Sequence, residues 1–292
     1  MRAITSEIAS QPALWRKAAG VASAVASLLP APGEPAAAIG CGTSLHVART
    51  YAALREERNQ GTTDAATASE LSPYRSYGRV VAISRSGTTT EVLRTLERLR
   101  GSIATVAVTA VPGSPVASTA DDTIVLDFAN EQSVVQTRFA TTALAVLRAH
   151  IGDRLEAAIV DGEAALADAL PVEPTQFRQF VFLGQGWTAG LADEAALKVR
   201  EAASAWTEAY PAMEYRHGPI SAAGRGTLVW AIGPVDPGVL ADAAATGATI
   251  VNGGSDPMAE LILIQRMAVG LAEARGLDPD HPKYLTRSVV LP

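Results

Sequence analysis

The amino-acid sequence predicts an α/β protein with a parallel sheet and a duplicated unit. Short apolar runs alternate with helical patterns along the chain, which is the rhythm of successive strand–helix units in a parallel sheet. The apolar run and glycine-rich turn at residues 180–188 repeat the pattern of residues 36–44, at an offset of 144 residues. In this repeat Gly184, Gly186 and Thr188 match Gly40, Gly42 and Ser44. A duplicated α/β unit explains both observations.

Composition limits the classes of partner and compartment. The chain has 292 residues, of which 48% are hydrophobic, enough for one large or two ordinary domains. A net charge of −6 without a basic run disfavours nucleic acid and anionic membranes as partners. The single cysteine, Cys41, excludes an internal disulfide and a multi-cysteine metal site. Residues 1–12 lack the apolar core of a signal peptide, and no apolar run approaches the roughly 18 residues of a membrane span. We therefore expect a soluble, cytoplasmic protein.

The first half of the chain reads as a series of strands and helices. A helix is predicted over 5–29, and a short buried strand over 36–39 runs into the turn Gly40-Cys41-Gly42-Thr43-Ser44. A helix then continues to about Arg58. Strands over 103–109 and 123–126, and helices ending near 100 and spanning 134–150, complete this half.

The stretch 82–91 predicts a phosphate site. A buried strand, 80–83, carries four hydroxyl side chains to the start of the next helix: Ser84, Ser86, Thr88 and Thr89. Thr88 and Glu91 have the spacing of a capping box. Free backbone N–H groups and the positive end of the helix dipole favour an anion at such a turn. The alternative is a Ser/Thr-rich loop with ordinary helix capping. The turn at 40–44 follows a neighbouring strand, so both turns can meet one ligand at the carboxyl edge of the sheet.

The second half begins after a helix predicted over 153–170, where Pro171 and Pro174 break the pattern. We divide the chain into a first domain, 1–152, with the phosphate site, and a second domain, 153–292, in which 153–170 is a linker helix. The strand over 227–232 resembles the strand of the phosphate site, but Gly233-Pro234-Val235 follows it. This turn lacks hydroxyls, and Pro234 lacks an N–H group. We therefore expect one phosphate site per chain.

A charged row on the predicted helix 189–205 is the first catalytic candidate. Glu194, Lys198 and Glu201 lie at positions i, i+4 and i+7, on one helix face. The alternative is a solvated row of salt bridges. The chain has three lysines and 21 arginines. A lysine kept at position 198 therefore suggests that a compact amine is needed there.

His217 is the second candidate. It lies in the loop Glu214-Tyr215-Arg216-His217-Gly218-Pro219, and loops often carry function. A structural role is the alternative for any single histidine. His46 and His150 fall in helices and His281 in a proline-flanked tail, so none of these three is a candidate. No pair of histidines has metal-ligand spacing, and we expect neither a metal nor a cofactor.

These motifs together resemble the tandem sugar isomerase (SIS) domain family. The chain is similar over its whole length to the isomerase half of glucosamine-6-phosphate synthase, and to related ketose/aldose isomerases and amino-sugar-phosphate deaminases. The motifs are Cys41-Gly42-Thr43-Ser44, Ser84-Arg85-Ser86-Gly87, Ala196-Leu197-Lys198-Val199-Arg200-Glu201, Arg216-His217-Gly218-Pro219 and Leu285-Thr286-Arg287-Ser288-Val289. The resemblance implies two tandem three-layer αβα domains with parallel, flavodoxin-like, doubly wound sheets.

The resemblance also implies roles for individual residues. Glu201 is implied as the base that moves a proton between C2 and C1 of a sugar phosphate, with Lys198 beside the reacting carbons. His217 is implied to promote ring opening in the neighbouring subunit's site of a homodimer. The implied phosphate contacts are Ser44, Ser84, Arg85, Ser86 and Thr89. The implied sugar contacts are Cys41, Gly42, Thr43, Val134, Gln136 and Arg287.

Three departures from the synthase change the expected activity. The glutaminase domain is absent from this sequence, so amination from glutamine is not expected. Arg287 stands where the synthase has an imine-forming lysine, and Gln136 where it has a serine. Residues 130–133 and 215–219 resemble the catabolic relatives more closely.

The leading hypothesis is an isomerase of hexose or amino-hexose 6-phosphates, with release of ammonia if the substrate is an amino sugar. Such chemistry needs a carboxylate base, a proton shuttle for the ring oxygen and a nearby cation. Two alternatives stay open: a non-catalytic phosphosugar sensor, and a deglycase acting on a fructosamine 6-phosphate.

Overall fold

The computed structural model describes residues 2–291 and divides into two compact units, each with its own parallel sheet. The N-unit comprises residues 13–132, 136–156 and 286–291, and the C-unit comprises residues 2–12, 133–135 and 157–285. These units differ from the division 1–152 and 153–292 chiefly at the two ends of the described chain. Residues 2–12 group with the second half of the sequence, and residues 286–291 group with the first.

The N-unit is built on a five-stranded parallel sheet with the order β2-β1-β3-β4-β5, which is the order of flavodoxin-like doubly wound folds. The strands are β1 (Ala36–Gly40), β2 (Thr63–Thr67), β3 (Arg79–Ile83), β4 (Ala104–Thr109) and β5 (Asp122–Val125). The helices are α2 (Gln11–Val25), α3 (Thr43–Glu57), α4 (Thr90–Leu99), α5 (Pro115–Thr119) and α6 (Arg138–His150).

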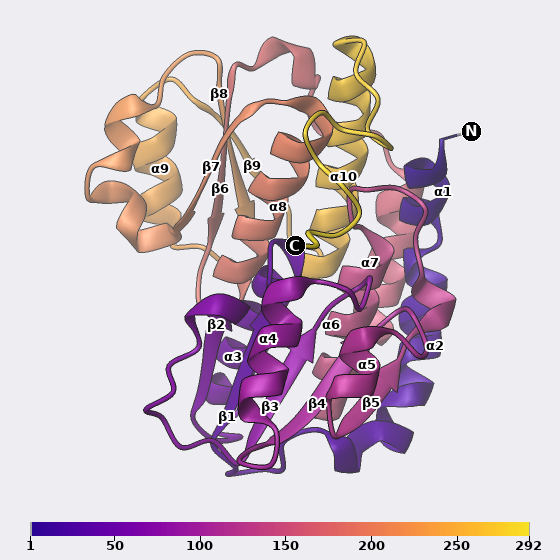
Figure 1. Ribbon diagram of the computed structural model, residues 1–292. Coiled ribbons are helices and arrows are strands. Elements are labelled where there is room, and N and C mark those ends of the chain that lie inside the picture. The colour runs from indigo at the N-terminus through magenta and orange to yellow at the C-terminus, as the bar shows by residue number, and fades with distance from the viewer. Residues whose placement is uncertain (1, 292) are drawn as a thin grey trace. The chain divides into compact units, whose positions relative to one another are not determined.

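Helices cover both faces of the N-unit sheet (Figure 1). Apolar side chains of α4 and α5, such as Val92, Leu96 and Val116, pack on the face that bears Ile39 and Val80. Helices α3 and α6 pack against each other, and α3 lies along β1 and β2 on the other face. Because both faces are covered, every residue of β1 is buried, and its sequence reads as an unbroken apolar run rather than an alternating one.

The C-unit repeats this architecture with a four-stranded parallel sheet in the order β7-β6-β8-β9. Its strands are β6 (Gln179–Gly184), β7 (Trp206–Pro211), β8 (Thr227–Ile232) and β9 (Thr249–Asn252). Its helices are α1 (Ala3–Ala9), α7 (Glu156–Ala167), α8 (Thr188–Ala203), α9 (Pro237–Ala245) and α10 (Pro257–Ala274). Short 3₁₀ helices of the two units are Ala26–Leu28, Ala68–Glu70, Asp127–Ala129, Pro174–Gln176, Ala212–Arg216 and Pro219–Ala222. The predicted tandem three-layer fold is confirmed.

The first glycine of the repeated motif has the same steric role in both halves of the chain. Gly40 and Gly184 are the last residues of β1 and β6. A Cβ atom on Gly40 would lie 2.6 Å from the Ser44 backbone, and one on Gly184 would lie 2.2 Å from the carbonyl oxygen of Thr188. Any larger side chain would therefore push the following helix away from the strand end. This shared requirement explains why the two halves repeat at these positions.

Three predicted helices have different limits in the structure. The predicted helix 5–29 is interrupted at Ser10 between α1 and α2, and Pro12 near the start of α2 cannot donate a backbone hydrogen bond. The predicted helices 134–150 and 153–170 shorten to α6 and α7. Residues 134–137 lie outside α6, and the N–H group of Val134 donates to the carbonyl of Asp280 (N···O 3.0 Å). No helix within residues 2–291 is both long and apolar enough to cross a membrane.

Candidate functional site

The hydroxyl side chains predicted to bind phosphate lie in the turn between β3 and α4. Ser84 and Ser86 are buried, and Thr89 is half-buried. The Ser84 and Thr89 hydroxyl oxygens lie 3.4 Å apart. Gly87 has φ of +66°, and a Cβ there would lie 2.0 Å from the Ser114 hydroxyl, so only glycine fits this turn.

The predicted capping box of Thr88 and Glu91 is wrong. Helix α4 starts one residue later, with Thr89 at the N-cap position and no side chain accepting a capping hydrogen bond. The Thr88 hydroxyl instead lies 3.1 Å from the Ser86 hydroxyl and 3.0 Å from that of Ser288. Since no side chain caps the helix, its first N–H groups remain candidate donors for an anion.

Ser44 lies on a neighbouring turn at the same edge of the sheet. It is buried in the first turn of α3, which follows β1. Strands β1 and β3 are parallel neighbours, with Ile39 paired to Ala82, so the turns after them leave the sheet side by side. The structure thus brings the two predicted turns to one edge. Cys41 in the first turn is half-buried; burial and, to a lesser degree, the Glu91 carboxylate raise the pKa of its thiol.

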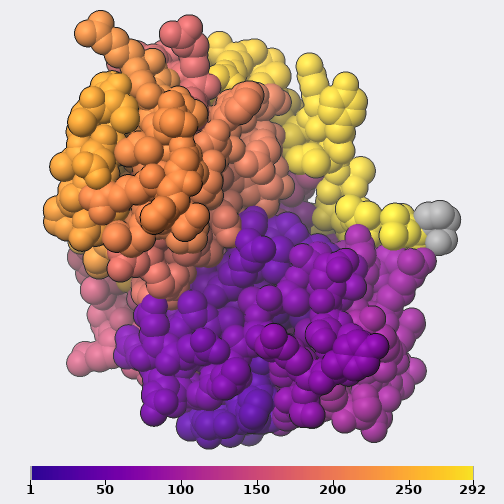
Figure 2. Space-filling model, turned by 90° about the vertical axis from the view of Figure 1, so that its left-hand side faces the viewer, coloured from indigo at the N-terminus to yellow at the C-terminus, as the bar shows by residue number. Residues whose placement is uncertain are grey.

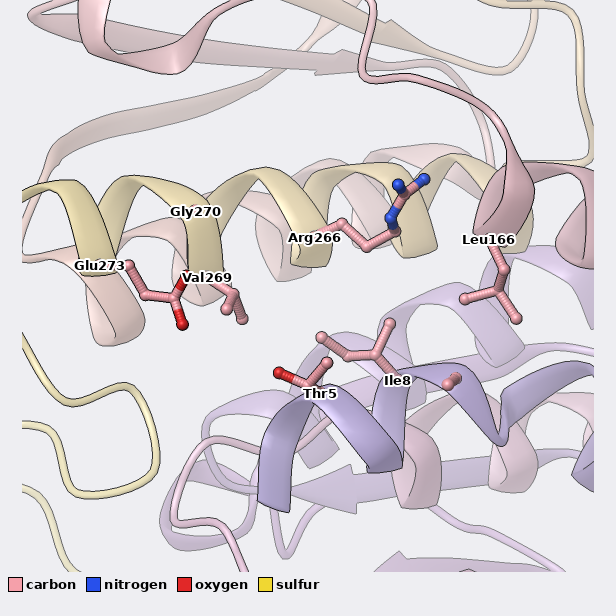
Figure 3. A pocket seen from close by; sticks show the side chains of 8 residues that line it. Thr5, Ile8, Leu166, Arg266, Val269, Gly270 and Glu273 are labelled. Atoms are coloured by element: carbon pink, nitrogen blue, oxygen red, sulfur yellow. The ribbon is translucent and has the colours of Figure 1, made fainter. Parts of the chain in front are cut away.

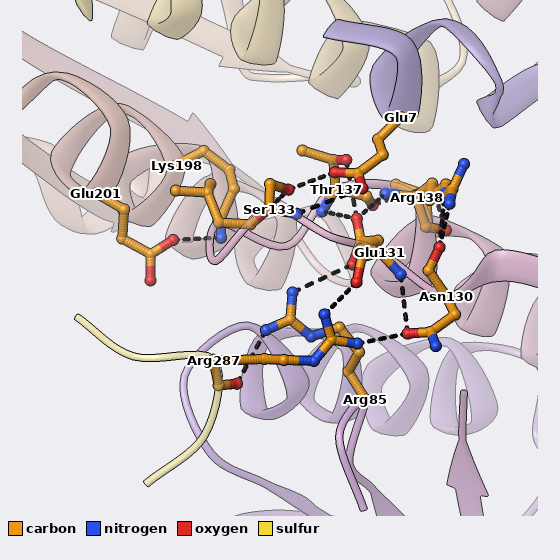
Figure 4. A network of polar contacts seen from close by, with 12 residues as sticks. Glu7, Arg85, Asn130, Glu131, Ser133, Thr137, Arg138, Lys198, Glu201 and Arg287 are labelled. Atoms are coloured by element: carbon orange, nitrogen blue, oxygen red, sulfur yellow. Dashed lines mark hydrogen bonds and ion pairs between the residues drawn. The ribbon is translucent and has the colours of Figure 1, made fainter. Parts of the chain in front are cut away.

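Arg85 is buried and its guanidinium contacts other protein groups. Its Nη1 lies 3.6 Å from Oε2 of Glu131, and its Nη2 donates to the carbonyl of Arg287 at 2.9 Å. Figure 4 shows both contacts, and both partners belong to the N-unit. The predicted phosphate ligand Arg85 therefore also fixes the turn to two other segments of its unit.

Glu131 connects that arginine to the start of α6. One carboxylate oxygen, Oε1, accepts from the backbone N–H groups of Thr137 (2.6 Å) and Arg138 (2.8 Å) and from the Thr137 hydroxyl (2.9 Å). Arg287 donates to the carbonyl of Glu131 and to Oδ1 of Asn130, the latter at 2.6 Å (Figure 4). Sequence reasoning noted residues 130–133 only as a family feature and missed this buried carboxylate.

The segment 286–291 lies across the start of α4. The N–H group of Thr90 donates to the carbonyl of Val289 at 3.2 Å, and the N–H group of Leu291 donates to the Thr90 hydroxyl at 2.9 Å. The yellow end of the chain in Figure 2 is at the surface, where Val289 and Val290 are 52% and 68% exposed. The Thr90 N–H group, at the start of α4 in the predicted phosphate site, is therefore hydrogen-bonded to this segment.

The charged row on α8 is in the C-unit and is largely buried. The side chain of Lys198 is 1% exposed; its Nζ lies 2.5 Å from Oε2 of Glu201 and 3.6 Å from Oε1 of Glu194. Glu194 is buried, whereas the Glu201 side chain is 21% exposed. The alternative of a solvated row of salt bridges is therefore wrong. The buried Lys198 ammonium group thus binds the Glu201 carboxylate, which stays partly exposed to solvent. Such an arrangement is suited to proton transfer.

Glu201 also lines a cavity of about 210 Å³ within the C-unit. The segment 276–283 also lines it, with Asp278, His281 and Lys283 among the lining residues. The sequence alone does not make His281 a candidate, and the structure adds it to the groups that line a cavity with Glu201. The signal that could have found it is the Asp278–His281 spacing of three residues, which allows the two side chains to pair.

His217 is exposed at the end of the 3₁₀ helix Ala212–Arg216. The neighbouring Arg216 is held by Asp242, with 2.7 Å between Nε and Oδ2. Within the part of the chain that the structure describes, the His217 ring makes no hydrogen bond. The structure does not join His217 to Glu201 in one chain.

Two further predicted contacts, Val134 and Gln136, are half-buried. Val134 belongs to the C-unit, and the segment around it is fixed by Glu7 of α1, which is 2% exposed. Glu7 accepts hydrogen bonds from the N–H group of Ser133, at 3.4 Å, and from its hydroxyl (Figure 4). Sequence reasoning missed this use of Glu7, because the two residues are 126 positions apart.

A larger cavity, of about 410 Å³, lies between α1 and α10 of the C-unit (Figure 3). Its charged side chains are already bound: Arg266 donates to the carbonyls of Ala165 and Asp168, and Glu273 accepts from Arg2 at 3.2 Å. Most of the rest of the wall is apolar, including Ile8 and Leu166. It lacks a set of reactive groups, so we do not assign it as the reaction site. Residues 2–291 also contain no group of three or more His, Cys, Asp or Glu side chains that could hold a metal ion.

Comparison with known proteins identifies the class. Residues 36–151 match the family model described as SIS domain. The chain is 28% identical over 300 residues to glutamine–fructose-6-phosphate aminotransferase (isomerizing) of Methanothermobacter thermautotrophicus, covering 87% of this chain and 51% of the relative. It is 31% identical over 291 residues to the protein of the same name from Sulfurisphaera tokodaii, covering 87% and 49%. The chain thus spans about half the length of these curated relatives.

Solved structures share the fold of this chain. The fold is similar to that of glucosamine-6-phosphate deaminase from Thermotoga maritima, with a TM-score of 0.86, 24% identity and 99% of each chain covered. It is also similar to tagatose-6-phosphate ketose/aldose isomerase from Escherichia coli, with a TM-score of 0.79, 19% identity and coverage of 97% and 96%. Residues 36–151 of this chain form a SIS domain, and the family resemblance stated from its motifs is confirmed.

Proposed function

We propose that this chain is a phosphosugar isomerase that interconverts aldose and ketose 6-phosphates through an enediol intermediate. The observation that carries the proposal is the pairing on α8 of a buried ammonium group, Lys198, with the partly open carboxylate of Glu201. A phosphosugar sensor would need the hydroxyl turn but not this pair. The family match at residues 36–151 supports a sugar-phosphate ligand.

In the proposed mechanism Glu201 takes the proton from C2 of the open-chain aldose and returns it to C1. The electron pair of the broken C–H bond forms the C1=C2 bond of the enediol, and negative charge develops on O1. The Lys198 ammonium group orients the carboxylate and stabilises nearby negative charge, since a low-dielectric site strengthens such interactions. His217 of a neighbouring subunit opens the sugar ring in this proposal, which requires a homodimer.

The phosphate is proposed to bind the hydroxyls of Ser44, Ser84, Ser86 and Thr89 and free N–H groups at the start of α4. Neutral donors suit a chain whose net charge is −6, because the local dipole rather than the global field must hold the anion. Arg85 stabilises the turn through its contacts with Glu131 and the carbonyl of Arg287. The proposed sugar contacts are Cys41, Gly42, Thr43, Val134, Gln136 and Arg287.

An amino-sugar 6-phosphate is the second candidate substrate, with ammonia leaving after isomerisation. The Arg287 side chain favours this over amination of a ketose. Its guanidinium is bonded to Asn130 and to the Glu131 carbonyl, and an arginine does not form the imine that a lysine can form. Ammonia release and isomerisation share the same proton transfer, so one assay can measure both.

The test is proton exchange in D₂O with fructose, tagatose, glucosamine and galactosamine 6-phosphates. Deuterium at C1 or C2, followed by NMR, measures the proton transfer, and an ammonia assay run beside it identifies a deaminase. We expect exchange with at least one of the four sugars. Binding of a sugar phosphate without exchange would contradict the isomerase and leave a sensor as the function.

Replacing Ser86 by alanine is expected to weaken sugar-phosphate binding by about 10- to 100-fold, the cost of losing one hydrogen bond to a charged group. Calorimetric titration with the active 6-phosphate measures the change. Ser118→Ala, at an exposed position of α5, is the matched control and should bind as the unmodified protein does. Equal affinity in both variants would argue against a phosphate contact at Ser86.

A further inference from the structure

The cavity beside Glu201 contains a second group able to carry protons. Within the C-unit, this cavity is lined by Glu201 and Ser204 of one segment and by residues of the segment 276–283. His281 lies in that segment with its side chain 77% exposed. A small molecule entering the cavity from solvent can therefore reach the imidazole and the Glu201 carboxylate together.

Asp278 fixes the orientation of this histidine. Its Oδ2 lies 3.2 Å from Nδ1 of His281, while Oδ1 accepts from Arg2 at 2.6 Å and from the N–H group of Asp280 at 3.1 Å. Partial burial opposes ionisation of Asp278, but these hydrogen bonds and the Arg2 charge outweigh it, and the pKa of the carboxyl is lowered. An ionised carboxylate at Nδ1 stabilises the tautomer with the proton on Nδ1, leaving Nε2 as the basic nitrogen.

We propose that His281 is a catalytic residue of its own subunit, which moves a proton between O1 and O2 of the open-chain sugar. This inference rests on the proposed isomerase function. As Glu201 removes the C2 proton, the carbonyl electrons move to O1, and O1 takes the proton from Nε2 of the imidazolium. The neutral imidazole then takes the O2 proton while Glu201 returns its proton to C1. The product is the ketose, and both side chains regain their starting protonation states.

Isomerisation also moves a proton from O2 to O1. While Glu201 holds the proton taken from C2, it cannot accept the O2 proton, so a second group serves this transfer. Lys198 is buried and held by Glu201 and Glu194. Lys283 also lines the cavity, but an ammonium group is a donor with no lone pair to accept a proton. An imidazole both gives and accepts a proton near neutrality, so His281 is the group in this cavity suited to the task.

The test is chemical rescue of the His281→Gly variant of this 292-residue chain. With the sugar that shows exchange in the unmodified protein, the variant is expected to lose about 10²- to 10⁴-fold in kcat, the usual share of general acid–base catalysis, with KM little changed. Added imidazole should restore activity in a saturable manner, since the exposed cavity can admit it. Glu201→Gln should not respond to imidazole, and His281→Gln, which retains a donor toward Asp278, should be as inactive as His281→Gly.

The outcomes separate this inference from the proposed function. If the unmodified protein exchanges no proton with any of the four sugars, the isomerase proposal fails and this inference fails with it. If the unmodified protein is active and both His281 variants keep at least half of its kcat, this inference alone is wrong. Loss of activity without imidazole rescue, in a variant that melts at the unmodified protein's temperature, would assign His281 a structural role and also overturn it.

Discussion

Glu201→Gln is expected to lower the rate of proton exchange at C1 and C2 by at least about 10³-fold. Glutamine has the shape of glutamate and can keep an oxygen toward Lys198, but its amide cannot accept a proton from carbon. Binding of the sugar phosphate should change little, because the proposed phosphate contacts lie in the N-unit turns. The NMR exchange assay and calorimetric titration measure the two quantities separately.

The matched control is Glu97→Gln, at an exposed position of α4. This variant should exchange protons at the rate of the unmodified protein. Undiminished exchange by Glu201→Gln would show that another group is the base, and the proposed mechanism would have to be abandoned.

Lys198→Met is expected to lower the free energy of unfolding by about 3–5 kcal/mol, the usual cost of removing one member of a buried ion pair. Methionine fills a similar volume, so the loss comes from the carboxylate of Glu194, which stays buried after its neighbouring charge is removed. Glu201 is partly exposed and can turn to solvent. Urea unfolding followed by circular dichroism measures the change.

Two further variants make that prediction specific. Lys283→Met makes the same substitution at an exposed lysine and should leave the free energy of unfolding within about 0.5 kcal/mol. Adding Glu194→Gln to Lys198→Met should restore part of the lost stability, because it removes the buried carboxylate charge that faced Lys198. A Lys198→Met protein as stable as the unmodified one would show that the α8 pair is not desolvated.

The sequence predicted the buried strands of both sheets more reliably than the edges. Strands β1, β3 and β8 read as apolar runs because helices cover both of their faces. Strand β2, with the sequence Thr-Asp-Ala-Ala-Thr, lies at a sheet edge and is mostly half-buried. It has neither an apolar run nor a clear alternation, so no local signal distinguished it from a loop.

The candidate site was predictable where chemistry is local and not where it depends on distant segments. The hydroxyl turn follows its strand directly, so residue order alone located Ser84 and Ser86. The spacing of Lys198 and its two carboxylates was equally visible, but their burial depends on what packs over α8. Likewise His281 is 80 positions from Glu201, and only the fold shows that the two side chains line one cavity.

The placement of residues 286–291 in the N-unit has a consequence for biosynthesis. Arg85 and Thr90 bond to the backbone of this segment, whereas the sheet that bears them is encoded more than 150 residues earlier. During translation the sheet can form while the second half is still being made, but its hydroxyl turn gains these partners only after residues 286–291 have left the ribosome. The nascent chain therefore cannot complete the turn before the C-unit residues have also been synthesised.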